Sequence, residues 1–131
     1  MKKIIFSVLV CTFLSCQENR PHGNQYKLPE LTPNNLLIGS LNENRSSYRV
    51  SFYDINIDFD IEKKSLDGFV TIKAESIRDL NKLQIDLAEN LSIEKVTYEN
   101  QELSYSREFD AVLIDFSSTI KEGNMFEFTV F

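Results

Sequence analysis

Few residues of this 131-residue chain could perform chemistry, because it contains one histidine and two cysteines. His22 lies among prolines and amides, so a Ser-His-Asp or Cys-His arrangement would take its general base from a poorly structured segment. The chain has no H-E-x-x-H sequence, in which two imidazoles one helical turn apart ligate zinc. We therefore predict no catalytic, cofactor-binding or metal-binding residue, and we interpret His22 as a solvated linker residue.

An acidic row is the one set of hard oxygen ligands that calls for comparison with a cation site. Asp54, Asp58 and Asp60 alternate with apolar residues. On a strand, residues two apart lie about 6.6 Å from each other on the same face. Calcium prefers such carboxylates, but a straight strand does not wrap around an ion, and no Asp-rich glycine loop accompanies the row. We interpret the row as a solvated strand face, with a cation site as the alternative.

The amino terminus has the parts of a secretory signal peptide. Lys2 and Lys3 precede an apolar run over residues 4–14, which is shorter than the about 20 residues that a membrane-spanning helix needs. Ser15 followed by Cys16 resembles a bacterial lipobox, in which the cysteine becomes the lipidated first residue of the mature protein. We predict a lipoprotein signal peptide over residues 1–15, lipidation of Cys16, and an exported protein anchored to a membrane of a bacterial cell envelope. An ordinary cleaved signal and a buried first strand are the alternatives.

Cysteine content argues against disulfide bonds in the mature domain, and net charge argues against a nucleic-acid partner. Cys11 would leave with the signal peptide, so the mature domain has no cysteine pair and depends on its core instead of disulfides. Loss of Lys2 and Lys3 takes the formal charge from −6 to −8. Nucleic-acid binding requires clustered Lys and Arg to neutralise phosphates, so this balance argues against it.

Composition divides the remaining chain in two. Residues 16–38 hold all three prolines and few apolar side chains, so they predict a flexible tether, from which the patch Leu36-Leu37-Ile38 could dock onto the domain that follows. Residues 39–131 alternate between apolar and polar positions in short runs separated by turn signals. This pattern predicts an all-β fold, an antiparallel sandwich or a saddle-like sheet.

The domain is organised around a long β-hairpin over residues 48–74. After a polar four-residue loop over residues 62–65, the alternation resumes and places both apolar rows on one face. The expected register pairs Ile61 with Leu66, Ile57 with Val70, Ile55 with Ile72 and Asp54 with Lys73. The apolar phase changes within the first strand, which predicts a β-bulge near Phe52 and Tyr53.

The later strands are predicted from shorter alternating runs. Alternation predicts strands around residues 83–87, 91–98, 103–105, 112–116 and 126–130. Residues 76–87 also fit helical spacing, and Ser76 with Asp79 could cap a helix; we favour a turn followed by a strand.

The hairpin sequence, Y-D-I-N-I-D-F-D-I-E-K-K-S-L-D-G-F-V-T-I-K, resembles the opening strands of the aminopeptidase N family of zinc metallopeptidases. The resemblance extends over roughly residues 39–131 and covers only the family's non-catalytic N-terminal β-domain. It implies that zinc and the catalytic residues belong to a catalytic domain missing from this chain, and that peptide substrates are reached only through that domain. The family's G-A-M-E-N-type segment, which binds the substrate's free amine, is absent as well.

The last residues, 125–131, alternate to the end without a polar tail, which we interpret as an apolar edge strand where a missing portion belongs. A final strand inside the sheet is the alternative. Two functions follow. The chain is expected to be the N-terminal part of an exported zinc aminopeptidase, truncated at its carboxyl end, or else a stand-alone β-sandwich surface lipoprotein that binds a partner or ligand.

Overall fold

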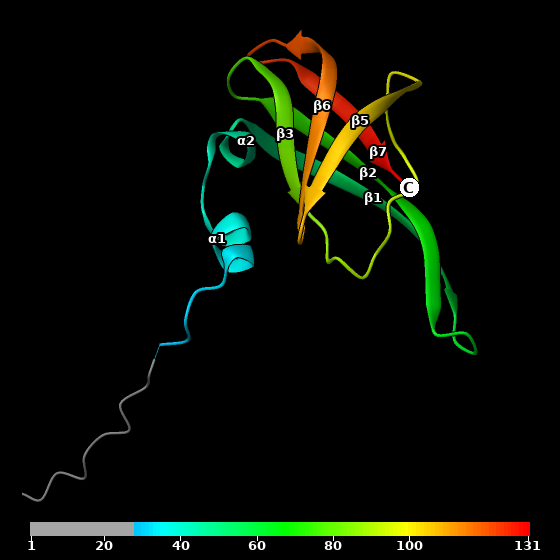
Figure 1. Ribbon diagram of the computed structural model, residues 1–131. Helices are drawn as coiled ribbons and strands as arrows, with labels where there is room; N and C mark the ends of the chain where they lie inside the picture. The colour runs from blue at the N-terminus through cyan, green and yellow to red at the C-terminus, as the bar shows by residue number, and fades with distance from the viewer. Residues whose placement is uncertain (1–27) are drawn as a thin grey trace, which may run out of the picture.

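The computed structural model describes residues 28–131, so the predicted signal peptide, Cys16 and His22 lie outside the described residues. Seven antiparallel strands form one curled sheet in the order β1-β2-β7-β4-β5-β6-β3 (Figure 1). The elements are α1 (Pro33–Gly39), α2 (Glu43–Ser46), β1 (Tyr48–Asp60), β2 (Ser65–Ser76), β3 (Leu80–Asp86), β4 (Val96–Tyr98), β5 (Gln101–Glu108), β6 (Ala111–Ile120) and β7 (Met125–Val130). The all-β antiparallel fold is confirmed, as one continuous curled sheet.

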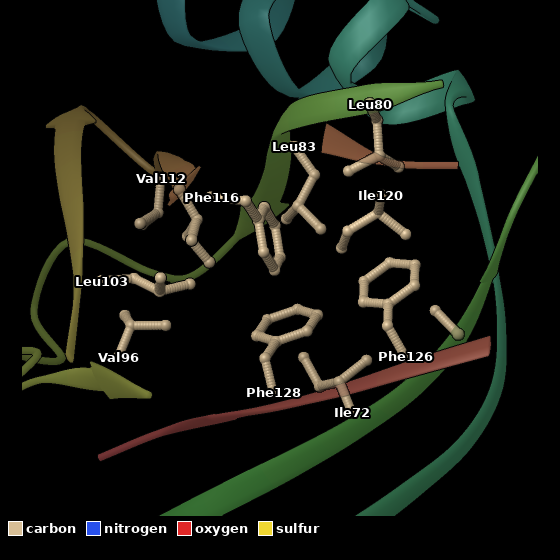
Figure 2. Packing of buried hydrophobic residues seen from close by; sticks show 12 residues of the cluster. Ile72, Leu80, Leu83, Val96, Leu103, Val112, Phe116, Ile120, Phe126 and Phe128 are labelled. Carbon is tan, nitrogen blue, oxygen red and sulfur yellow. The ribbon is translucent and has the colours of Figure 1, made fainter. Parts of the chain in front are cut away.

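Strand β5 turns the sheet over on itself. Its first residues, 101–103, pair with β4, and its remaining residues, 104–108, pair with β6. The strands β3, β6 and β5 therefore face β2, β7 and β4 across the interior, and the hydrophobic core lies between them (Figure 2). Because the curl brings two apolar faces together, one sheet encloses a core as two packed sheets would.

Phenylalanines dominate this core. Phe116 on β6 meets Phe126 and Phe128 on β7 edge to face, with ring centroids 5.7 and 6.1 Å apart. Edge-to-face contact places the positive ring edge against the negative ring face, which adds about 0.5–1.5 kcal/mol to the burial of each pair. Leu83 and Ile114 are fully buried beside them. Stability therefore comes from the two faces of the curl.

A β-bulge sets which side of β1 faces the core. The register of β1 against β2 shifts between Val50 and Phe52, so Ser51 is the extra residue. Before the bulge Val50 lies opposite Ala74, and after it Tyr53 lies opposite Ile72, which is in the core. The bulge thus keeps Val50 and Tyr53 on the same inner face, at a position one residue earlier than predicted, and leaves Phe52 on the outer face opposite Lys73.

The predicted hairpin register is wrong by two residues. The structure pairs Phe59 with Leu66, Ile57 with Gly68, Ile55 with Val70 and Tyr53 with Ile72. The turn occupies residues 61–64, with Lys64 at a positive φ of 53° and Asp60 accepting a hydrogen bond from the Lys63 amide at 2.9 Å. A shift of two preserves the faces, so the apolar rows still share one side. The predicted pairing of Asp54 with Lys73 is lost, and Lys73 instead bonds Glu127 at 2.9 Å.

The prediction of a bare apolar edge at the last strand is also wrong. Strand β7 lies between β2 and β4, and Phe128 is 1% exposed. Its other face carries Met125, Glu127 and Thr129, of which Met125 and Glu127 are exposed. Alternation alone describes a strand with one buried face, whether that strand is central or at an edge, so the pairing partners were not readable from these residues.

Residues 77–79 form the turn before β3, as favoured over a helix, whereas residues 91–93 form no strand. Residues 33–38, expected to belong to the tether, lie in helix α1, which Thr32 caps together with Asn35. Neither α1 nor α2, the helices of residues 28–131, is long and apolar enough to cross a membrane.

Candidate functional site

The β1–β2 hairpin extends beyond the rest of the sheet (Figure 1). Strand β7 supports β2 only from Val70 to Glu75, so residues 56–69 pair with nothing in the described part of the chain except each other. We call residues 56–69 the arm. Two-stranded hairpins are marginally stable in water unless a hydrophobic face is covered, and among the described residues no further strand pairs with the arm.

The inner face of the arm continues the core face. Four side chains of β1 form what we call the inner row, and all are exposed: Tyr53, Ile55, Ile57 and Phe59. On β2 the same face runs outward from buried Ile72 through Val70 to exposed Leu66. No strand of the described sheet lies across from the arm, so this apolar surface has no covering layer there. Contiguous exposed apolar surface is typical of a binding site.

This face forms one side of an open groove with a volume of about 1560 Å³. Three residues of the inner row, Tyr53, Ile57 and Phe59, line it together with the beginning of β1, the end of β3 and the loop over residues 87–94. Gly68 lies opposite Ile57 and contributes no side chain to the groove. The strands approach so closely there that a Cβ at this position would meet the Asn56 carbonyl oxygen. The groove is therefore both apolar and shaped by a close approach of two backbones.

A polar network closes the end of the groove near β3. Gln84 is 2% exposed and accepts a hydrogen bond from Asn42 Nδ2 at 2.9 Å. Its own Nε2 donates to the Leu37 carbonyl at 3.2 Å, and its carbonyl accepts from the Tyr48 hydroxyl at 2.7 Å. Burial, with weaker effects from nearby charges, raises the pKa of Tyr48 to about 12. Arg45 forms an ion pair with Asp86 at 2.6 Å. These groups are already satisfied by one another, so they support the wall.

Arg107 fixes the loop that forms the opposite wall. Its guanidinium donates to the carbonyls of Leu87, Ala88 and Leu91 at 2.6 Å each, and to that of Phe109 at 3.0 Å. A planar guanidinium has five donors in a rigid fork, which suits it to hold several backbone oxygens at once. The loop over residues 87–91 therefore has a defined shape although it contains no strand.

The outer face of the hairpin carries the acidic row. Asp58 lies opposite Asp67, while Asp60 forms an ion pair with Lys63 at 2.9 Å. The pKa of Asp60 is lowered chiefly by the hydrogen bond from the Lys63 amide. Among residues 28–131 no three His, Cys, Asp or Glu side chains lie close enough together to hold a metal ion. The described residues therefore contain no cluster that fits a zinc ion, which the family resemblance assigns to a separate catalytic domain.

Sequence reasoning placed the apolar alternation correctly but did not find the groove. The signal is present in the sequence, since Ile57 and Phe59 of β1 lie beyond Val70, the last residue of β2 that pairs with β7. Recognising this requires the pairing of β7, which the sequence alone did not provide. The predicted site residue Cys16 remains a prediction.

No protein-family model matches the sequence, and no curated protein matches it. Solved structures do. The chain is similar, with a TM-score of 0.59 and 15% identity, to a two-domain M1 zinc metallopeptidase bound to L-tryptophan, over 66% of this chain and 20% of that one. The M1 zinc metallopeptidase from Deinococcus radiodurans gives a TM-score of 0.56 at 14% identity, over 66% and 20% of the two chains. The same enzyme bound to a Tyr-Ser-Ala substrate gives 0.57 at 15%, over 64% and 20%.

These similarities define a class of fold, a curled antiparallel sheet that forms one part of a larger enzyme. The matching region spans about a fifth of the length of the metallopeptidases. The fold is thus one found within M1 zinc metallopeptidases, and the resemblance drawn from the hairpin sequence is confirmed at the level of the fold.

Proposed function

We propose that this chain is the non-catalytic N-terminal β-domain of an exported zinc aminopeptidase, and that it supports the catalytic domain that removes N-terminal residues from peptides. The observation that carries the proposal is the exposed inner row, whose residues Ile57 and Phe59 extend the core face into the arm, beyond the part of β2 that pairs with β7. The fold shared with M1 zinc metallopeptidases supports a catalytic domain as the neighbour of this surface.

In this function the chain binds and positions, and the catalytic domain supplies zinc and the reacting groups. The groove wall supports this division, since its polar side chains Gln84, Tyr48 and Arg45 are engaged with their neighbours. Docking of a catalytic domain on the inner row would remove exposed apolar area from water, at about 25 cal/mol per Å². Peptides would then meet this chain only as one wall of a cavity shared with that domain.

The experiment begins with a search for a reading frame that encodes an H-E-x-x-H sequence. The search covers the DNA beyond the codon for Phe131 and the neighbouring genes. A reading frame with an H-E-x-x-H sequence is expressed together with the full chain, and zinc-dependent hydrolysis of amino-acid p-nitroanilides is measured with copurification. We expect the two to associate, and the pair to be more active than the H-E-x-x-H protein alone. The double variant Ile55→Asp, Phe59→Asp should abolish association, while Glu102→Gln, a charge change elsewhere, should not.

Two results would overturn this function. One is a genome in which no H-E-x-x-H protein associates with the chain. The other is an H-E-x-x-H protein that folds and reaches full activity without it. Either result would favour the alternative function, a surface lipoprotein that binds a different partner.

We also propose that Cys16 anchors the chain to a bacterial envelope membrane through a lipid. The change Cys16→Ser should move the protein from the membrane fraction to the soluble fraction after expression in a bacterium. Cys11→Ser is the matched control, because it removes a thiol from the predicted signal peptide and leaves the lipidation position intact. Equal partitioning of the wild-type and Cys16→Ser proteins would contradict the anchor.

A further inference from the structure

The two edges of the curled sheet differ in whether other described elements cover them. At the β3 edge, Asn42 bonds Gln84, Arg45 pairs with Asp86, and Leu37 accepts from Gln84. Helices α1 and α2 thus lie along that edge (Figure 1). At the other edge β1 pairs only with β2, and no strand of the described chain lies on its outer side. Edge strands direct unpaired N–H and C=O groups outward, which makes β1 a template for another strand.

The side chains on the two faces of β1 determine which residues would suit an added strand. A strand added at this edge places its alternate side chains on opposite faces. One set would lie beside the inner row, and the other beside the acidic row Asp54, Asp58 and Asp60. The first set is therefore apolar and the second basic.

The charges support a basic partner and argue against a second copy. Asp58 lies directly opposite Asp67, and like charges in that position destabilise a strand pair. No ion pair joins Asp54, Asp58 or Asp67 to another described residue, whereas Asp60 has Lys63. Pairing of two β1 edges would bring two acidic rows together. A lysine or arginine on an added strand would instead lie between carboxylates.

We propose that an extended segment of alternating apolar and basic residues adds to the free edge of β1 as an antiparallel or parallel strand. Its apolar side chains enter the groove beside the inner row, and its basic side chains reach the acidic row. Main-chain hydrogen bonds supply affinity, and the alternation supplies specificity. The inference rests on the proposed function only for the source of the segment, which is then the catalytic domain.

The test uses the full chain and capped peptides labelled with a fluorophore. The probe V-K-V-K-V-K-V is compared with V-E-V-E-V-E-V, with V-V-K-V-V-K-K, which has the same composition without alternation, and with the alternating basic peptide N-methylated at every second residue. Binding is followed by anisotropy at two salt concentrations, and amide hydrogen exchange maps the site. We expect the alternating basic peptide to bind about tenfold or more tighter than each of the others, and to protect amides of β1.

Variants of the chain sharpen this result. The double variant Asp58→Asn, Asp67→Asn should weaken binding of the basic peptide about tenfold and should reduce its salt dependence. Glu102→Gln, an exposed charge change on β5, should leave both unchanged.

Equal affinity for the acidic and basic peptides, indifference to N-methylation, or protection of β3 in place of β1 would overturn the inference. So would dimers of the chain alone that protect β1. If the peptides fail while the H-E-x-x-H protein still associates, the edge pairing fails and the proposed function stands. If the peptides bind and no H-E-x-x-H protein associates, the reverse holds.

Discussion

The two halves of the β1–β2 hairpin belong to the same strand pair and share an apolar inner face, yet the inner face of β2 differs in burial between them. Near the sheet, Ile72 is 6% exposed beneath the covering strands, whereas Phe59 on the same face of the arm is 72% exposed. The difference lies outside the hairpin, because β7 and the opposite half of the curl end before the arm begins. An apolar row in a sequence therefore defines a face, and the neighbouring elements decide whether the chain covers it.

The largest effect should come from removing an aromatic ring from each region. Phe128→Ala deletes a ring that is 1% exposed and that packs against Phe116, so it should lower the free energy of unfolding by about 3–5 kcal/mol. Phe59→Ala removes a similar ring from the arm and should change stability by about 0.5 kcal/mol or less. Urea denaturation of the full chain measures both. Similar losses for the two variants would mean that the arm is covered in solution.

A methyl group at position 68 should disrupt strand pairing in the arm and leave the packing of the core unchanged. A Cβ there would lie 2.1 Å from the Asn56 carbonyl oxygen and 2.9 Å from the Ile57 Cα, so the two strands must separate. We expect Gly68→Ala to lower the free energy of local opening of the arm by about 1–3 kcal/mol and so to increase hydrogen exchange in the arm alone.

Gly39→Ala is the matched control, because a Cβ at Gly39 meets nothing within 4 Å. That variant should be within about 0.5 kcal/mol of the wild type. Faster exchange at core residues such as Leu83 in Gly68→Ala would show that the arm and the core unfold as one unit, contrary to their separation in the sheet.

The sequence was sufficient for the hairpin and the faces of its strands but not for the strand neighbours, for helix α1, or for residues 91–93, which form no strand. Period-two alternation identified the hairpin, and the change of phase identified the bulge now found at Ser51. The register failed because the polar run Glu62 to Ser65 allowed more than one turn, and a two-residue shift costs no change of face. Strand β7 lies between β2 and β4 and is not the predicted edge, because pairing partners depend on contacts distant in the chain.

The site was less predictable for the same reason. Each wall of the groove comes from a different part of the chain, with Gln84 on β3, Arg107 on β5 and the inner row on β1. Arg107 carries no local signal that it holds the loop over residues 87–91, since its four acceptors are backbone carbonyls. The resemblance to a metallopeptidase domain gave the fold, and only the curled sheet revealed which surface remains uncovered.

The covered edge offers the next comparison. Gln84→Ala removes the side chain that connects Asn42 and the Leu37 carbonyl to β3, and it leaves polar groups near a buried position without partners. The expected loss of stability is about 1–3 kcal/mol, accompanied by faster exchange in α1 and α2. Gln101→Ala, at an exposed position on β5, should be neutral within about 0.5 kcal/mol. Unchanged exchange in both helices would mean that Gln84 does not hold them.

Acid should weaken the contact between helix α1 and the turn that joins β5 to β6, and this effect should be the smallest of the series. Asp110 accepts hydrogen bonds from Asn34 Nδ2 at 2.6 Å and from the Glu89 amide at 2.7 Å, and these bonds lower the pKa of Asp110. A lowered pKa in the folded state stabilises the contact above the ordinary aspartate pKa of about 3.9, and this stabilisation is lost as the pH falls through the folded-state value. Helix α1 should therefore loosen below about pH 4.

NMR of the Asn34 side-chain amide and the Glu89 backbone amide between pH 6 and pH 2 measures this release. In Asp110→Asn both signals should lose their acid transition, because the titrating carboxylate is gone. Asp79→Asn is the matched control: Asp79 accepts from Lys121 and the Glu122 amide, which lower its pKa in the same way at the β6–β7 turn. That variant should lose the transition at Glu122 and keep the one at Asn34. An acid transition at Asn34 that persists in Asp110→Asn would place the contact that holds α1 elsewhere on the covered edge.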